Sequence, residues 1–249
     1  MAGTIANCER LDMQTRPKKL LDTSGGNTKL KKTGGASAEY RVAGLSLFPS
    51  DTLCPARHLA GCAASCLESA GCGVFSNVIA GRQAKAEWFE SDRDSFLDQL
   101  HKELDNFERL CERQGVKGAV RLNVLSDVPW EKLGVPQRHP NLFFYDYTKL
   151  SHRLGKTPDN YRLMFSYSGA AKYQKHVTRA LSADVPMSVV FRGDMPAEYL
   201  GRPVIDGDRS DLLNVMAGPV IVGLVAKGKA KTEAGPFVVD TNLIARAAA

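Results

Sequence analysis

The sequence predicts an α/β protein, an irregular or incomplete parallel β/α barrel that follows a polar N-terminal arm. Its 249 residues, 43% of them hydrophobic, suffice for one large domain with one core. Short apolar runs rich in β-branched and aromatic residues alternate with helical segments, as in parallel βαβ units. We therefore expect an arm over residues 1–38 and a single domain over residues 39–249.

The arm is rich in Gly, Ser, Thr and Lys, and its SGGNTK and TGGAS stretches are typical of turns. The N-terminus has no apolar segment of the kind found in signal peptides. The chain has no apolar run of about 18 residues, the length that a membrane span needs. These features predict a soluble protein of the cytoplasm with no membrane partner.

The elements of the domain follow from hydrophobic spacing. The first buried strand is expected at 40–48. Phe96, Leu100, Leu104 and Phe107 recur at helical spacing, so a helix is expected over 86–115, ending at Gly115. Further strands are predicted at 118–127, 141–149, 161–169, 186–194, 201–206 and 218–228, with helical or turn connections at 128–140 and 170–184.

Four of the six cysteines lie in one short window, LCPARHLAGCAASCLESAGCGVF, at residues 53–75. Their spacing is C-x7-C-x3-C-x5-C, and the window follows directly on the first predicted strand. In a reducing cytoplasm, clustered cysteines more often bind a metal or perform redox chemistry than form disulfides.

The spacing allows all four thiols to reach one metal centre. Cys62 and Cys66 stand four residues apart, which places both on one face of a predicted helix. Gly71 is expected to stop that helix so that Cys72 folds back, while Cys54 approaches from the strand end. Four thiolates suit tetrahedral zinc or an iron–sulfur cluster. Because the paired C-x2-4-C knuckles of structural zinc sites are absent, the pattern favours a [4Fe–4S] cluster.

Polar residues at the ends of the other predicted strands are expected to face the cysteines. In parallel α/β folds, functional groups gather where the carboxyl ends of the strands meet. Each of these residues by itself is also typical of a turn or a helix cap. The predicted cofactor-binding residues are Ser126, Asp127, Lys149, Ser166, Ser168 and Arg192.

The net charge of +6 raises the question of a nucleic-acid partner. The basic runs RPKK at 16–19, KLKK at 29–32 and KGKAK at 227–231 contain no aromatic residues that could stack on bases. The charge therefore favours a solvated surface. Nucleic-acid binding is kept as an alternative that is not favoured.

The order of these segments resembles the bacteriophage gene product 88 family. The resemblance runs over roughly residues 25–240, through NTKLKKTG, the cysteine window, SNVIAGRQAKAEWFESDRDSFLDQLHKEL, VRLNVLSD, FFYDYTK, NYRLMFSYSG, VIDGDRSD and GPVIVGLVAKGKAK. It implies a phage protein of the host cytoplasm, with a barrel-like fold distantly similar to radical S-adenosylmethionine enzymes. It implies no particular reaction.

Three functions remain open from the sequence. The leading hypothesis is a [4Fe–4S] protein in which Cys54, Cys62, Cys66 and Cys72 all bind iron, with a redox or electron-transfer role toward a small molecule or a redox partner. The first alternative is a radical enzyme with three cysteine ligands and S-adenosylmethionine at the fourth iron, although Cys62 and Cys66 match only the first half of the usual C-x3-C-x2-C spacing. The second is a basic nucleic-acid-binding protein with structural zinc. The sequence indicates no oligomeric state.

Overall fold

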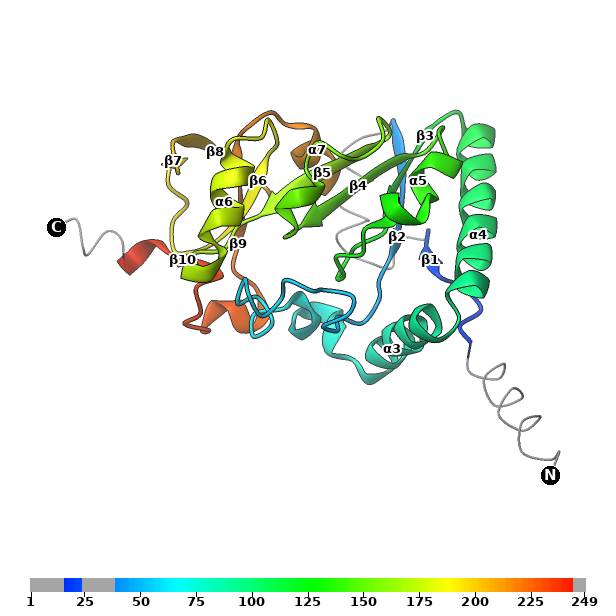
Figure 1. Ribbon diagram of the computed structural model, residues 1–249, viewed down its shortest axis with the longest axis horizontal. Coiled ribbons are helices and arrows are strands. Elements are labelled where there is room, and N and C mark those ends of the chain that lie inside the picture. The colour runs from blue at the N-terminus through cyan, green and yellow to red at the C-terminus, as the bar shows by residue number, and fades with distance from the viewer. Residues whose placement is uncertain (1–15, 24–38, 244–249) are drawn as a thin grey trace, which may run out of the picture.

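The computed structural model describes residues 16–23 and 39–243, apart from the side chains of Ser69 and Cys72. It shows a mixed α/β fold in which helices pack against a central sheet (Figure 1). The α-helices are α3 (Ser76–Ser91), α4 (Arg93–Gln114), α5 (Val135–Arg138), α6 (Gln174–Leu181) and α7 (Asp211–Met216). Short 3-10 helices lie at Leu67–Ser69, Gly71–Val74, Trp130–Leu133, Ser151–Arg153, Ala171–Tyr173 and Gly228–Lys231.

Within the described residues, the strands form one ten-stranded sheet in the order β1-β2-β3-β4-β5-β6-β9-β8-β7, with β10 paired to β6. Pairing is parallel from β2 through to β8, and the short β1 and β7 add antiparallel edges. The strands are β1 (Leu21–Asp22), β2 (Tyr40–Leu45), β3 (Lys117–Arg121), β4 (Phe143–Thr148), β5 (Tyr161–Ser166), β6 (Met187–Arg192), β7 (Glu198–Tyr199), β8 (Arg202–Asp206), β9 (Ile221–Val225) and β10 (Val238–Asp240).

Strand β6 has different neighbours along its length. Strand β9 pairs with it from Met187 to Phe191, while β5 pairs only at Met187 and Ser188, and β10 pairs from Val190 onward. Because a strand has only two edges and β9 occupies one, β5 and β10 must share the other. The sheet therefore opens between β5 and β10 at the carboxyl end of β6.

The two faces of the sheet bury different helices, because successive side chains of a strand point to opposite faces. Ala43, Val120 and Phe144 belong to the core formed with α3 and α4. Their neighbours Val42, Ala119 and Tyr145 belong to a second core, to which α7 contributes Leu212 and Val215. Since these residues lie in the first part of their strands, α7 leaves the carboxyl-terminal part of that face open to other groups.

The helix expected over 86–115 is wrong in one respect, because the structure has two helices here. Asp92 leaves the helical conformation at φ −145° and ψ 76°, and its carboxylate accepts a hydrogen bond from the Ser95 amide. An aspartate in this role caps a new helix. The predicted end is confirmed, since Gly115 has φ 64° in the left-handed region that favours glycine.

The predicted helix through Cys62 and Cys66 is also wrong. Residues 51–66 form successive turns, in which the Gly61 amide donates to the His58 carbonyl and the Cys62 amide to the Arg57 carbonyl. Gly61 has φ 65°, and a Cβ there would lie 3.0 Å from the Pro236 side chain. A glycine in the left-handed region directly before Cys62 ends any helical run at that point.

Part of the segment predicted as the N-terminal arm packs on the domain. Leu20 and Leu21 are buried, and their amides donate to the Glu103 carboxylate on α4. The rest of the arm, residues 1–15 and 24–38, lies outside the described residues. In the described part of the chain, no helix is long and apolar enough to cross a membrane.

A buried histidine pair joins α4 to the loop after α5. His101 Nδ1 and His139 Nε2 share a hydrogen bond of 2.8 Å, and the two rings stack at 5.1 Å. Burial lowers the pKa of His101 to about 4 and also lowers the pKa of His139. Because one ring nitrogen of the hydrogen bond must act as acceptor, protonating both rings would break it.

We expect this pair to make folding sensitive to acid. The unfolded chain takes up protons near the ordinary histidine pKa of about 6.5, while folded His101 does so only near pH 4. The free energy of unfolding should therefore fall between pH 6.5 and 4, by on the order of 2 kcal/mol. Urea unfolding across this range should show a flatter profile for His101→Gln than for the parent. The matched change at exposed His152 should leave the profile unaltered, and an equal slope in both variants would contradict the assignment.

Candidate functional site

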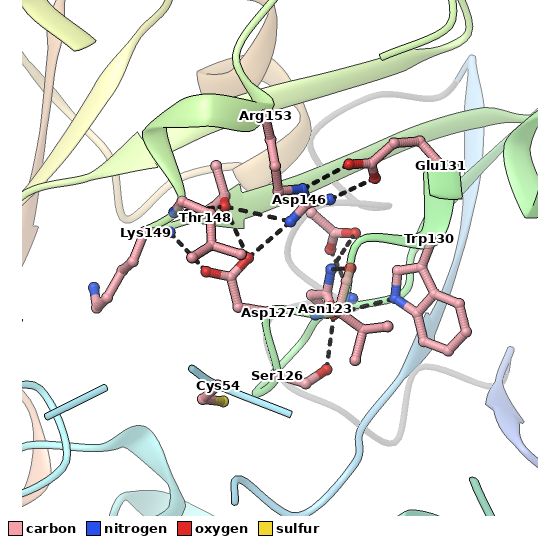
Figure 2. Close-up of polar contacts among 12 residues, drawn as sticks. Cys54, Asn123, Ser126, Asp127, Trp130, Glu131, Asp146, Thr148, Lys149 and Arg153 are labelled. Carbon is pink, nitrogen blue, oxygen red and sulfur yellow. Dashed lines mark hydrogen bonds and ion pairs between the residues drawn. The ribbon is translucent and has the colours of Figure 1, made fainter. Parts of the chain in front are cut away.

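A cavity of about 180 Å³ lies where the parallel strands end. One wall comes from the cysteine window, through Cys54, Cys62 and Cys66 together with Arg57. Another comes from the turn after β3, where Ser126 and Asp127 lie beside Cys54 (Figure 2). The cavity therefore brings three of the four clustered cysteines to the ends of the strands.

The remaining wall is the sheet face that α7 leaves open. Arg121, Tyr147, Ser166, Ser188 and Leu224 line it from β3, β4, β5, β6 and β9. Four of these residues lie two positions after a residue of the α7-facing core on the same strand, so their side chains point to the same face. The fifth, Ser188, pairs with Ser166 and Val222 and therefore lies on that face as well. The cavity thus lies between the cysteine window and this open part of the sheet face.

The structure places the six predicted cofactor-binding residues in two groups. Ser126, Asp127, Lys149 and Ser166 line the cavity with the cysteines. The other two are not among its lining residues, and each holds a loop in place. Ser168 donates to the Ala60 carbonyl at 2.6 Å, and Arg192 donates to the Ala230 carbonyl and lies 3.2 Å from Asp240.

The thiols are held in a largely buried environment. Cys54 Sγ lies 3.5 Å from the Leu125 carbonyl, to which it donates. Burial raises the pKa of Cys54 to about 12, with a further contribution from Asp127, and burial also raises the pKa of Cys66. Arg57 opposes both shifts. Cys54 and Cys66 are therefore neutral thiols, and metal binding to them would release their protons.

The described side chains do not form a site for a single metal ion. Among them, no three His, Cys, Asp or Glu groups gather closely enough to hold one. The predicted set of four cysteines includes Cys72, whose side chain lies outside the described residues. The structure therefore places Cys54, Cys62 and Cys66 around one cavity without testing the complete ligand set.

Several buried polar atoms in and beside the cysteine window make no hydrogen bond in the described structure. Ser65 Oγ, Glu68 Oε2 and Arg82 Nη1 are buried and make no hydrogen bond to the described residues. Arg82 interacts electrostatically with both Cys66 and Glu68. Buried polar groups in folded proteins are nearly always satisfied, so these atoms are available to a group bound at this window.

The buried amide of Asn123 fixes the turn that carries Ser126 and Asp127 (Figure 2). Its Oδ1 accepts hydrogen bonds from the Ser126 hydroxyl at 2.8 Å, the Val128 amide at 2.9 Å and the Trp130 indole at 3.1 Å. Its Nδ2 donates to the Val128 carbonyl and to Asp146. A single side chain thus closes the turn at the edge of the cavity.

Arg153 neutralises the carboxylates behind the same wall. It lies 2.8 Å from Asp127 and 2.8 Å from Glu131, and its own side chain is fully buried. Burial raises the pKa of Asp127, against the opposing effect of Arg153. Thr148 and the Lys149 amide donate to Asp127 as well. Both carboxylate oxygens of Asp127 therefore accept hydrogen bonds from residues of the cavity wall.

Sequence reasoning missed several residues of the cavity, among them Arg121. This arginine is 4% exposed, pairs with Asp211 at the start of α7 and lies over the Tyr147 ring at 4.4 Å. A lone arginine inside the apolar run GAVRLNV was a usable signal, because a charge in a buried strand needs a partner. The partner could not be identified from the sequence, since Asp211 lies 90 residues away. The other charged residues that it missed are Arg57, Asp208 and Lys227.

The fold and the cavity define a class, an α/β protein with a mostly parallel sheet and a cysteine-bordered cavity at its strand ends. The chain belongs to the family described as gene product 88, whose model matches residues 18–239. This match supports the bacteriophage origin that the resemblance implied. No curated protein and no solved structure matches the chain. The expected distant similarity to radical S-adenosylmethionine enzymes therefore has no support from these comparisons.

The Asn123 network provides a stability test. Replacing Asn123 by Leu leaves Asp146 and the Trp130 indole without this partner, and each buried polar group so stranded costs about 1–3 kcal/mol. We expect a loss of about 3 kcal/mol or more in the free energy of unfolding, measured in urea. Asn141→Leu, which removes an exposed contact to Glu108, should cost less than about 1 kcal/mol. Equal losses in the two variants would show that Asn123 has no special role.

Proposed function

We propose that this chain is an iron–sulfur protein that binds a [4Fe–4S] cluster through Cys54, Cys62, Cys66 and Cys72 and uses it for redox chemistry on a small molecule. The observation that carries the proposal is the shared cavity, which Cys54, Cys62 and Cys66 border together with polar residues from the strand ends. A cluster bound at these thiols would face the bound molecule directly.

The chemistry of the donor set fits such a cluster. Thiolates are the usual protein ligands of iron–sulfur clusters. Arg57 and Arg82 lie close enough to the cysteines to favour their anionic forms. The unpartnered polar atoms of Ser65 and Glu68 are consistent with a bound group at this window. When bound, the cluster would supply or accept one electron, and the surrounding residues would hold the reacting molecule.

A small-molecule reactant is favoured over a protein redox partner by the cavity itself. Electron transfer between proteins requires that the cluster lie near the surface, and it does not require an internal cavity for a ligand. Here the same face of β3, β4, β5, β6 and β9 lines one cavity. We accordingly propose that the sheet is an incomplete barrel around the reactant.

The catalytic alternative uses the same cavity. If only three cysteines bind iron, the fourth iron can bind S-adenosylmethionine, since an open coordination position is what permits chemistry at a metal. Cys54 is the residue expected to be dispensable, because it comes from the strand end while the other cysteines follow one another in the loop. The two versions differ in one measurable property, the number of cysteine ligands.

The alternative of a zinc-containing nucleic-acid-binding protein is not favoured. The basic run at 227–231 borders the cavity through Lys227, which is paired with Asp208. The run at 29–32 lies outside the described residues. A basic side chain that is already paired beside a cavity contributes little to a surface for nucleic acid.

Metal analysis is the primary test. Anaerobically purified protein should be brown and contain about four irons and four sulfides per chain, the composition of one [4Fe–4S] cluster. Iron and sulfide are measured chemically and the cluster by its visible absorption. One zinc per chain, without iron or colour, would falsify the proposal and favour the zinc alternative.

Cysteine substitution separates the closed cluster from the open one. If all four cysteines bind iron, replacing any one of Cys54, Cys62, Cys66 and Cys72 by alanine should cause loss of the cluster. S-adenosylmethionine should then leave the electron paramagnetic resonance spectrum of the reduced cluster unchanged. Cys111→Ala, at a buried cysteine on α4, is the matched control and should keep its iron. An intact cluster in Cys54→Ala that responds to S-adenosylmethionine would instead establish the open form.

A further inference from the structure

Arg121 lines the cavity with a buried guanidinium that has one hydrogen-bond donor without a partner in the described structure. The residue is 4% exposed and lines the cavity wall, and its Nη1 donates to Asp211. Its Nε is buried and has no hydrogen-bond partner in the described structure. A guanidinium has five N–H donors in a planar fork that matches a carboxylate or a phosphate. A buried arginine with an unfilled donor beside a cavity is therefore suited to an acidic ligand.

Lys149 adds a second cation to the same cavity. Its Nζ donates to the Ser166 hydroxyl at 2.6 Å and lies 4.4 Å from the centre of the Phe237 ring. Neither contact neutralises the charge, and in the described residues no carboxylate oxygen lies within ion-pair distance of Nζ. An ammonium group has three donors, so at least two remain for a ligand.

The acidic groups of the cavity are already engaged. Asp127 is paired with Arg153 and Asp208 with Lys227, so neither needs the Lys149 ammonium. Much of the remaining lining is apolar, which suits an organic body rather than a bare inorganic ion. These apolar lining residues include Val124, Leu125, Val190, Leu224 and Phe237.

We propose that the cavity binds a small organic anion, a carboxylate or a phosphate, whose acidic group is held by Arg121 and Lys149 while its apolar part lies against Val190, Leu224 and Phe237. The proposal names the class of molecule on which the proposed iron–sulfur chemistry would act. It rests on the cavity rather than on the cluster, so the two can fail separately.

The test measures ligand binding to the full-length protein as purified, with iron determined on the same sample. Benzoate, succinate and phenyl phosphate are the anionic probes, and benzamide, succinamide and phenol are their uncharged counterparts. We expect the anions to raise the midpoint of thermal unfolding at millimolar concentration while the uncharged compounds do not. A response to the carboxylates alone or to phenyl phosphate alone identifies the acidic group.

Substitutions then place the anion in the cavity. Lys149→Met should weaken binding roughly tenfold, as expected for loss of a charged hydrogen bond, while Lys172→Met, at an exposed lysine, should leave it unchanged. Arg121→Gln combined with Asp211→Asn removes the guanidinium without stranding its carboxylate, and should weaken binding by a similar factor in a protein that still folds cooperatively.

Several results would overturn the inference. These are no stabilisation by any anion, equal stabilisation by the uncharged compounds, or undiminished binding in both the Lys149 and the Arg121 variants. Because iron content is measured on the same sample, a protein that binds iron but no anion would contradict only this inference. A protein that binds the anions but no iron would contradict only the proposed cluster.

Discussion

The buried amide of Asn123 is the constraint on which the strand-end face depends. The residue follows β3 by two positions, where the chain turns away from the sheet, and a turn there leaves backbone groups buried without partners. Its side chain satisfies both the amide and the carbonyl of Val128 while its own backbone amide donates to Asp146. Because leaving such groups unpaired is expensive in the interior, the turn has one low-energy conformation. That conformation brings Ser126 and Asp127 to the cavity.

Asp146 and Arg153 extend this constraint across the neighbouring strands. Asp146 is fully buried, and burial raises its pKa to about 7, although hydrogen bonds from Tyr161 and Asn123 favour its ionised form. Arg153 joins Asp127, Glu131 and the Tyr161 hydroxyl. A buried network of this kind is stable only when its members are satisfied together. The turn after β3 is thus held in one arrangement with β4 and the beginning of β5.

The cysteine window is tied to this rigid edge by backbone contacts rather than by its own secondary structure. The Asp127 amide donates to the Leu53 carbonyl, and the Ser168 hydroxyl donates to the Ala60 carbonyl. The first contact holds the window near Cys54 and the second holds it just before Cys62. Ser168, expected to bind a cofactor, therefore acts on the site by positioning the loop that closes it. Loops held in this way by a rigid scaffold are where binding residues commonly occur.

Most elements of the fold could be predicted from the sequence, because local patterns decide them. The runs that became β4 and β5, and the helix end at Gly115, follow from hydrophobic spacing and from the conformational freedom of glycine. The break at Asp92 was missed because the helical spacing of apolar residues continues through it. An aspartate occurs both inside helices and as the cap of a new helix, so its identity does not reveal the break.

The site was only partly predictable. In a parallel sheet, the polar residues at the carboxyl ends of the strands lie close together. The cavity is accordingly lined by Ser126, Asp127, Lys149 and Ser166. Which strand ends point inward was decided by partners distant in the chain. Arg192 turns to the Ala230 carbonyl and Asp240, while Arg121 is held in the cavity wall by Asp211, 90 residues away. The sequence by itself determined most of the strands and the cysteine cluster, since these depend on near neighbours. Only the tertiary structure decided which charged side chains face the cavity. A buried charged side chain is oriented by its partner of opposite charge, and that partner can be distant in the sequence.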